Sequence, residues 1–253
     1  MPSQHTSGGS APLGEDPAGR SAGTDRWTIP MWVAYLNKVL GKLRVPYDLK
    51  KRFDHHEDMV SLEQLSNFEL LIDHALESGV AGDFVELGCY TGNTTAVFAS
   101  LLKRSGEGHR SLHVYDRFDA YLGSVRDIRS AFEQNIRDTG AAMPTIHAGD
   151  IFHTVPAELP ERIAFAHIDL GTGTSVEDHR RLMDHALHSI HPRLSPGGYM
   201  VFMDYHVPER TLHGHDSNPG VRMACDAFFA DKPERVKLLY GGPCSHAYIR
   251  KQG

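Results

Sequence analysis

The sequence predicts an α/β fold built on an open, Rossmann-like sheet of mostly parallel strands. Two observations carry this prediction: short apolar runs alternate with helical stretches from residue 81 onward, and five of these runs end in an acidic residue. A chain of 253 residues is long enough for one such domain with appendages. We expect a disordered tail over residues 1–25, a helical cap or N-terminal extension over 26–80 and the main domain over 81–253.

Composition narrows the kind of partner. The formal net charge is −6 and the Lys and Arg residues do not cluster, which argues against nucleic acid as a substrate. Carboxylates at a sheet edge would attract a cationic small molecule, although a modest negative charge also serves solubility alone. The three cysteines (Cys89, Cys225 and Cys244) are widely spaced, and neither a signal peptide nor a membrane-spanning run is evident, so we expect a cytoplasmic protein with reduced thiols.

The N-terminal extension is expected to be helical. Apolar residues between Pro30 and Leu43 recur at helical spacing, and this helix would cap a cofactor, form a dimer contact or pack on its own core. His55 and His56 lie among acidic residues, but adjacent residues do not share a face, so we expect a solvated loop rather than a metal site. A further helix is expected up to Leu76.

The most informative stretch runs from residue 83 to residue 95. Phe84 and Val85 belong to a strand, Glu86 lies near its end, and Gly88 and Gly92 form a turn before an apolar helix. The glycine spacing fits neither the dinucleotide fingerprint nor a Walker loop. An acid beside the turn would repel a pyrophosphate but suits S-adenosylmethionine (SAM), which carries a sulfonium and an ammonium. A strand-turn-helix that binds no ligand is the alternative.

Four further strands are predicted near residues 111–116, 146–150, 163–169 and 197–204, and each ends in Asp. The acid that ends the second strand can accept hydrogen bonds from ribose hydroxyls, or it can cap a helix. Because ligands of open α/β sheets bind at the carboxyl edge, these acids predict a site there together with Glu86. The four residues are Asp116, Asp150, Asp169 and Asp204. Residues 236–240 and 246–250 predict a closing antiparallel hairpin.

Six motifs follow one another in a fixed order: Gly82–Gly92, Val114–Phe118, His167–Asp169, Leu194–Gly198, Asp204–Tyr205 and Pro219–Arg222. Over about residues 55–250 the chain thereby resembles the macrocin O-methyltransferase family, class I SAM-dependent enzymes that tailor sugars on antibiotics. The resemblance implies a Rossmann-like class I methyltransferase sheet with a C-terminal antiparallel hairpin, and a homo-oligomer. It also implies a loop over the SAM at residues 59–61. The expected SAM-binding residues are Met59, Ser61, Glu86, Gly88, Tyr90, Thr91, Thr94, Asp116, Arg117, Asp150 and Asp169.

The resemblance also implies a divalent cation, held by one Asp after the fourth strand and an Asp-Asp pair after the fifth. Asp169 matches the first of these ligands, but the pair reads Met203–Asp204, and a hard cation does not accept a thioether in place of oxygen. The segment 170–175 supplies no second acid either. We therefore expect that no divalent metal is required, with Asp169 and Asp204 as the ligands if one binds.

Without a metal, an amine is the more plausible acceptor, because a neutral amine is already nucleophilic and an amino sugar is a cation that suits acidic residues. The expected catalytic residues are Asp169, Asp204, Tyr205 and His206, with the last three at the mouth of the site. His206 is either a proton acceptor or a surface-loop histidine. The loop 211–218 either shapes the acceptor pocket or is a flexible excursion, and a metal site on its His213, His215 and Asp216 has no regular scaffold.

These observations predict a SAM-dependent methyltransferase acting on an amino sugar of an antibiotic-like natural product. N-methylation of an aminoglycoside is favoured, and the resemblance also admits a gentamicin-pathway type of enzyme. Metal-dependent O-methylation of a sugar hydroxyl is the alternative. A SAM-binding module without catalysis is an alternative from another class.

Overall fold

A computed structural model describes residues 31–47, 49, 60–119, 127–171, 175–208, 210–211, 216, 218–241 and 245–253. The chain divides into two compact units, Met1–Lys51 and Arg52–Gly253. The predictions for residues 1–25, for His55 and His56 and for Met59 lie outside the described residues, as do His213 and His215.

The first unit contains one described helix, α1 (Met31–Lys42), which confirms the helical spacing between Pro30 and Leu43. Val33 is its buried residue, while Trp32 and Tyr35 are exposed. The Asn37 side chain exchanges two hydrogen bonds with the backbone of Leu49, 2.9 and 2.7 Å long, and so ties the following turn to the helix.

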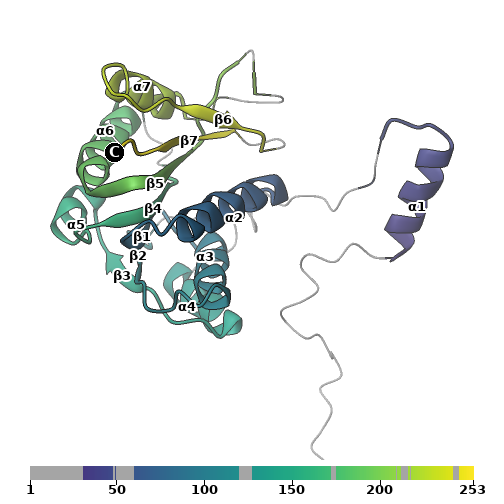
Figure 1. The fold of residues 1–253 in the computed structure, drawn as a ribbon, viewed down its shortest axis with the longest axis horizontal. Coiled ribbons are helices and arrows are strands. Elements are labelled where there is room, and N and C mark those ends of the chain that lie inside the picture. The colour runs from purple at the N-terminus through teal and green to yellow at the C-terminus, as the bar shows by residue number, and fades with distance from the viewer. Residues whose placement is uncertain are drawn as a thin grey trace, which may run out of the picture. The chain divides into compact units, whose positions relative to one another are not determined.

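The second unit carries the predicted sheet (Figure 1). Its seven strands stand in the order β3-β2-β1-β4-β5-β7-β6. Strands β3, β2, β1, β4 and β5 run parallel to one another, and β7 is antiparallel to both β5 and β6, so the parallel sheet with a closing hairpin is confirmed. The strands are β1 (Asp83–Leu87), β2 (Leu112–Asp116), β3 (Thr145–Ala148), β4 (Ile163–Ile168), β5 (Leu194–Met203), β6 (Lys237–Leu239) and β7 (His246–Arg250).

Helices cover both faces of this sheet (Figure 1). Side chains of α2 (Leu62–Glu77), α3 (Asn93–Arg104) and α4 (Ile128–Thr139) pack in one core, around Phe68, Phe98 and Phe132. Side chains of α5 (Ile151–Ala157), α6 (Val176–Ile190) and α7 (Pro219–Phe228) pack in the other, and α6 leads into a short 3₁₀ helix, His191–Arg193. From β1 the chain adds β2 and β3 on one side of the sheet, and then β4 and the later strands on the other side. The reversal point therefore lies between β1 and β4, and open α/β sheets bind ligands at such a point.

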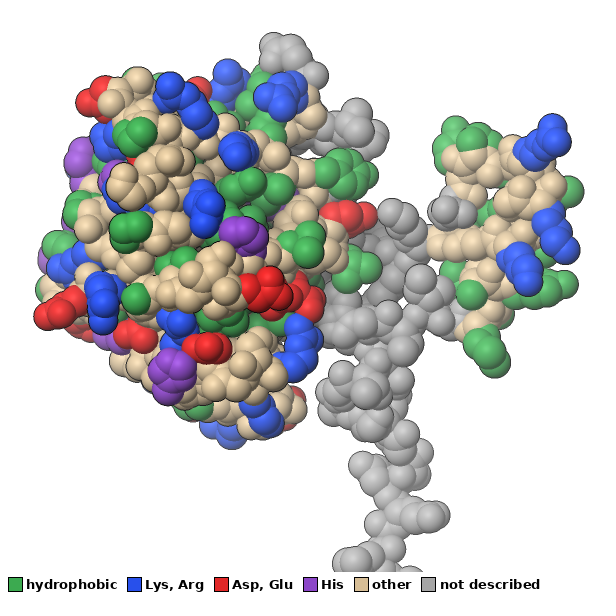
Figure 2. Space-filling view, viewed as in Figure 1, with side chains coloured by type: hydrophobic (Ala, Val, Ile, Leu, Met, Phe, Trp, Pro, Cys, Tyr) green, Lys and Arg blue, Asp and Glu red, His purple; other side chains and the backbone are tan. Residues whose placement is uncertain are grey.

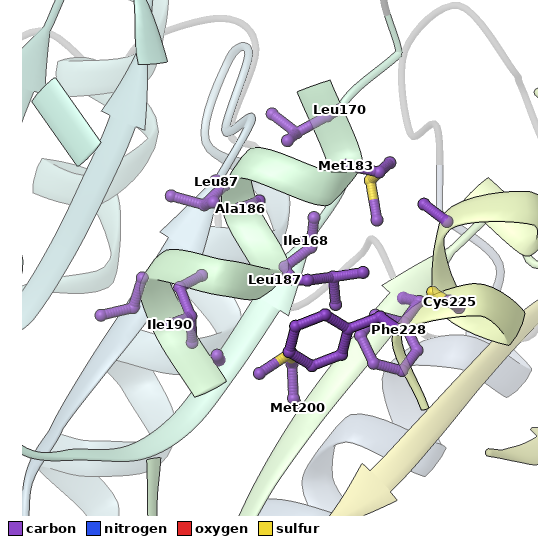
Figure 3. Close-up of a cluster of buried hydrophobic side chains, with 14 of the residues drawn as sticks. Leu87, Ile168, Leu170, Met183, Ala186, Leu187, Ile190, Met200, Cys225 and Phe228 are labelled. Carbon is purple, nitrogen blue, oxygen red and sulfur yellow. The ribbon is translucent and has the colours of Figure 1, made fainter. Parts of the chain in front are cut away.

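Strand alternation decides which face of the sheet each residue covers. On β5, Met200 and Phe202 belong to the core under α6 and α7, whereas Val201 and Met203 belong to the core under α2. Figure 3 shows Met200 with Leu187 of α6 and Phe228 of α7 in the first of these cores. None of the helices in the described part of the chain is long and apolar enough to cross a membrane.

Candidate functional site

The turn after β1 is pressed against the end of β4. Gly88 has φ +79°, and a Cβ there would lie 1.9 Å from the carbonyl oxygen of Asp169. A backbone hydrogen bond from Asp169 N to Leu87 O at 2.8 Å fixes this approach, and one from Gly88 N to Tyr115 O at 2.9 Å ties the turn to β2. Only glycine fits both the left-handed conformation and the available space.

Asp116, at the end of β2, supports this turn from the side. Its carboxylate accepts the backbone N–H groups of Cys89 and Tyr90, each at 2.9 Å, and that of Phe118 at 2.7 Å. A carboxylate has about four lone-pair positions, so roughly one of them stays open for a ligand hydroxyl. Cys89 is buried, which raises the pKa of its thiol and disfavours the reactive thiolate.

Glu86 supports the turn from beneath. Its side chain is fully buried in the core under α2 and α3, where it accepts a hydrogen bond from Thr95 Oγ1 at 2.5 Å. The Nδ1 atom of His167 lies 3.3 Å from the other carboxylate oxygen. Glu86 shares a strand face with Phe84, so it faces this core rather than open solvent at the sheet edge.

Three other expected SAM residues lie at the glycine turn, and a fourth, Arg117, lies apart from them. Thr91 and Thr94 are buried at the turn and in the first turn of α3, and Tyr90 has a left-handed φ of 45° beside them. These three lie with Gly88 after the end of β1, in the turn that Asp116 of β2 supports. Arg117 follows β2 with an exposed side chain and pairs with Asp119, 2.7 Å away.

Ser61 and Asp150 both cap helices. Ser61 Oγ accepts the Gln64 backbone N–H at 3.2 Å at the start of α2 and donates to Gly241 O at 2.7 Å. Asp150 lies two residues beyond the end of β3, where its carboxylate accepts the Phe152 N–H at 2.9 Å and starts α5. Asp150 is exposed and has further acceptor positions open, whereas both roles of the Ser61 hydroxyl are occupied.

Asp169 and Asp204 form a pair of acids on one side of the reversal point. They follow β4 and β5, which are neighbours in register up to Ile168 and Phe202, and both side chains are half-buried. Burial, and then the nearby Asp204 carboxylate, raise the pKa of Asp169 to about 7. Burial also raises the pKa of Asp204, with the Asp216 carboxylate acting in the same direction. A carboxylate whose pKa lies near neutrality can exchange a proton at physiological pH.

The environment of Asp204 is unusual. It has a left-handed φ of 60°, its backbone N–H donates to Ser245 O at 2.9 Å, and its carboxylate accepts Asn218 Nδ2 at 2.6 Å. Non-glycine residues in this conformation cost energy and concentrate at functional sites.

The residues that would hold a metal do not fit one. Met203, at the position where the resemblance implies a second Asp, is buried in the core under α2, where its sulfur lies 3.9 Å from Gln64 Nε2. In the described part of the chain, no group of three or more His, Cys, Asp and Glu residues is arranged to hold a metal ion. Two carboxylates, one already bonded to an amide, are a poor donor set for a cation that prefers six oxygens.

Tyr205 and His206 differ from their expected positions. Tyr205 is buried in the core under α7, where its hydroxyl donates to Asp226, and burial raises the pKa of the phenol. His206 is also buried, with Nδ1 2.5 Å from Thr211 Oγ1. Both side chains are buried rather than at an open mouth of the site, and the Tyr205 ring packs in an apolar core, where aromatic rings are favoured.

Two residues near Asp204 were missed by the sequence reasoning. His179, on the first turns of α6, is 3% exposed and interacts electrostatically with Asp204. Asn218 immediately precedes α7, and the Asn-Pro pair that starts this helix was its one available signal. Nothing in the sequence distinguishes His179 among 17 histidines.

The comparisons with known proteins agree with this geometry. Residues 85–205 match a family model described as a methyltransferase domain. The chain is 26% identical over 174 residues to 8-demethyl-8-(2,3-dimethoxy-alpha-L-rhamnosyl)-tetracenomycin-C 4'-O-methyltransferase of Streptomyces olivaceus, covering 59% of this chain and 62% of that relative, so it spans less than two thirds of the relative's length. It is also 26% identical over 188 residues to mycinamicin III 3''-O-methyltransferase of Micromonospora griseorubida, covering 64% of this chain and 71% of that relative.

Solved structures are similar in fold. The O-methyltransferase NovP matches with a TM-score of 0.63 and 18% identity, over 88% of this chain and 99% of that one. The TDP-rhamnose 3'-O-methyltransferase CalS11 matches with a TM-score of 0.57 and 20% identity, over 88% of this chain and 95% of that one. The resemblance expected from the six motifs is therefore confirmed, and residues 85–205 match the model of a methyltransferase domain.

Proposed function

We propose that this protein transfers a methyl group from SAM to an amino sugar of an antibiotic-like natural product. SAM is the donor of class I methyltransferases, and both curated relatives are named for sugar positions of antibiotics. The preference for nitrogen rests on one observation: two half-buried carboxylates, Asp169 and Asp204, follow the neighbouring strands β4 and β5 on one side of the reversal point.

On the donor side, the glycine turn between β1 and β4 would hold SAM, which supplies an electrophilic methyl group when bound. The open acceptor position of Asp116 suits a ribose hydroxyl, and the exposed Asp150 suits a polar group of the adenine. Tyr90, Thr91 and Thr94 line the turn itself. Glu86 contributes by fixing the turn through Thr95 rather than by an exposed contact.

On the acceptor side, Asp169 and Asp204 would receive an ammonium group. An ammonium between the two carboxylates would offset the like-charge repulsion that, after burial, raises the pKa of Asp169. The amine must lose one proton before its lone pair can attack a methyl group, and a carboxylate with a pKa near 7 is a suitable acceptor for it. A sugar hydroxyl is a far weaker acid than an ammonium, so the same carboxylate is less well matched to it.

O-methylation is the second candidate, because both curated relatives are named as sugar O-methyltransferases. Asp169 would then serve as the base toward a hydroxyl, and the preference for a cationic sugar would disappear. In the relatives that the sequence resembles, a divalent cation assists this chemistry, but the donor set found here does not fit such a cation.

The decisive experiment uses methyl-labelled SAM, an aminoglycoside and the same aminoglycoside with its amines acetylated. Reaction with the free amine in the presence of EDTA, and none with the acetylated control, would support N-methylation. Reaction with the acetylated compound or with a neutral deoxysugar glycoside would instead assign oxygen. SAM binding without turnover on any of these acceptors would favour a module without catalysis.

A further inference from the structure

The helix α4 packs against the turn that the proposed function assigns to SAM. Gly92 has φ +78°, and a Cβ there would lie 2.5 Å from Cδ2 and 2.9 Å from Cε2 of Phe132. The Phe132 ring is fully buried, and a close-packed interior leaves such a ring little room to move. The second half of the glycine turn is therefore held against α4, as its first half is held against the end of β4.

Asn135, one helical turn beyond Phe132, reaches the same glycine turn with a hydrogen bond. Its Nδ2 atom donates to the carbonyl oxygen of Thr91 at 2.7 Å and to Asn93 Oδ1 at 3.4 Å. These two partners flank Gly92 and lie 44 and 42 residues from Asn135 along the chain. The Asn135 amide thus makes tertiary contacts that hold the backbone of the turn, rather than contacts within α4.

The same helix also supports the segment after β2. The Phe118 ring meets Phe132 edge to face, with ring centroids 5.5 Å apart, and the guanidinium carbon of Arg129 lies 5.1 Å from the Phe118 centroid. The Phe118 N–H donates to Asp116 at 2.7 Å, and the same carboxylate accepts two N–H groups of the glycine turn. Helix α4 therefore ties together the two segments that the proposed function assigns to SAM.

We propose that Asn135 is a positioning residue for SAM, which fixes the Thr91 carbonyl and holds the glycine turn in its binding conformation before the cofactor arrives. This inference rests on the proposed function, because that function places SAM at the turn. Asn135 needs no contact with SAM itself. Without its hydrogen bond the turn populates other conformations, and the apparent Kd rises as the competent fraction falls. A tenfold change corresponds to about 1.4 kcal/mol, which is within the range of one intramolecular hydrogen bond.

The test measures S-adenosylhomocysteine binding by calorimetry in Asn135→Ala and Asn135→Asp. Asp keeps the shape of Asn but has no donor when ionised, so it separates the hydrogen bond from the volume of the side chain. We expect Kd to rise roughly tenfold in Asn135→Ala, and at least as much in Asn135→Asp, where a carboxylate would face the Thr91 carbonyl oxygen. In turnover, the KM for SAM should rise by the same factor while kcat and the KM for the acceptor stay unchanged.

Gln134→Ala is the matched control. Gln134 is the neighbouring amide on α4, is exposed, and donates to Asp138 of the same helix at 2.6 Å, so its loss should leave ligand binding as in the wild type. If one Asn135 variant folds poorly, the other carries the same test. Wild-type affinity in Asn135→Asp, an equal loss in Gln134→Ala, or a fall in kcat with the KM for SAM unchanged would overturn the inference. A wild-type protein that binds no S-adenosylhomocysteine would overturn the proposed donor itself, and the inference with it.

Discussion

Replacing Gly88 by Ala tests the contact on which the site is built. Two costs add: the left-handed φ of +79° penalises a Cβ by roughly 1–2 kcal/mol, and the clash at 1.9 Å adds a further overpacking cost of about 1–3 kcal/mol. The clashing atom is the backbone oxygen of Asp169, so no side-chain rotation can relieve it. We expect a loss of unfolding free energy of roughly 2–5 kcal/mol, measured by urea denaturation, together with weaker binding of S-adenosylhomocysteine by calorimetry.

Gly106→Ala is the matched control. Gly106 has φ +74°, but no atom lies within 4 Å of a Cβ placed there, so this variant carries the backbone cost without the clash. It should lose only about 1–2 kcal/mol and bind the ligand normally. If Gly88→Ala were no less stable than Gly106→Ala and bound the ligand equally well, the turn would not be locked against β4 as described.

Three further predictions concern Asp204, Asp169 and Thr95. Asp204→Asn should abolish most methyl transfer while leaving SAM affinity nearly unchanged, and a collapse of SAM binding in calorimetry would move Asp204 to the cofactor side. Because the folded pKa of Asp169, about 7, lies above the ordinary value of 3.8, its ionisation costs stability as pH rises through that window. Asp169→Asn should therefore raise the Tm relative to wild type at pH 8 and not at pH 4. Thr95→Val should lower the unfolding free energy by about 1–3 kcal/mol or more, because the buried Glu86 carboxylate loses its donor, and an unchanged urea midpoint would argue against that pair.

Local patterns were sufficient to predict the sheet edge. The glycines at 88 and 92 and the strand-end acids lie where short-range turn chemistry and strand order require. The charge on the face shown in Figure 2 also agrees with the sequence, since Lys and Arg side chains are scattered among acidic ones. In these respects each prediction depended on residues that are neighbours along the chain.

Burial within the site could not be predicted in the same way. Strand alternation puts Glu86 on the same face of β1 as Phe84. The side chains beside its buried carboxylate, Thr95 and His167, come from other elements, so the sequence does not reveal them. The burial of Tyr205 depends on its packing against α7 and on its hydrogen bond to Asp226, and neither is encoded by a local pattern. The close approach of α7 to the start of α6 at Gly220 joins segments far apart in the sequence, which no local pattern encodes.

The central claim is methyl transfer to a sugar amine through Asp169 and Asp204. The most direct measurement is ¹³C NMR of the product formed from methyl-¹³C SAM and an aminoglycoside in the presence of EDTA. We expect the labelled methyl group on nitrogen, with the signal lost in Asp169→Asn and Asp204→Asn. A label found only on oxygen, and only when a divalent cation is supplied, would contradict the claim.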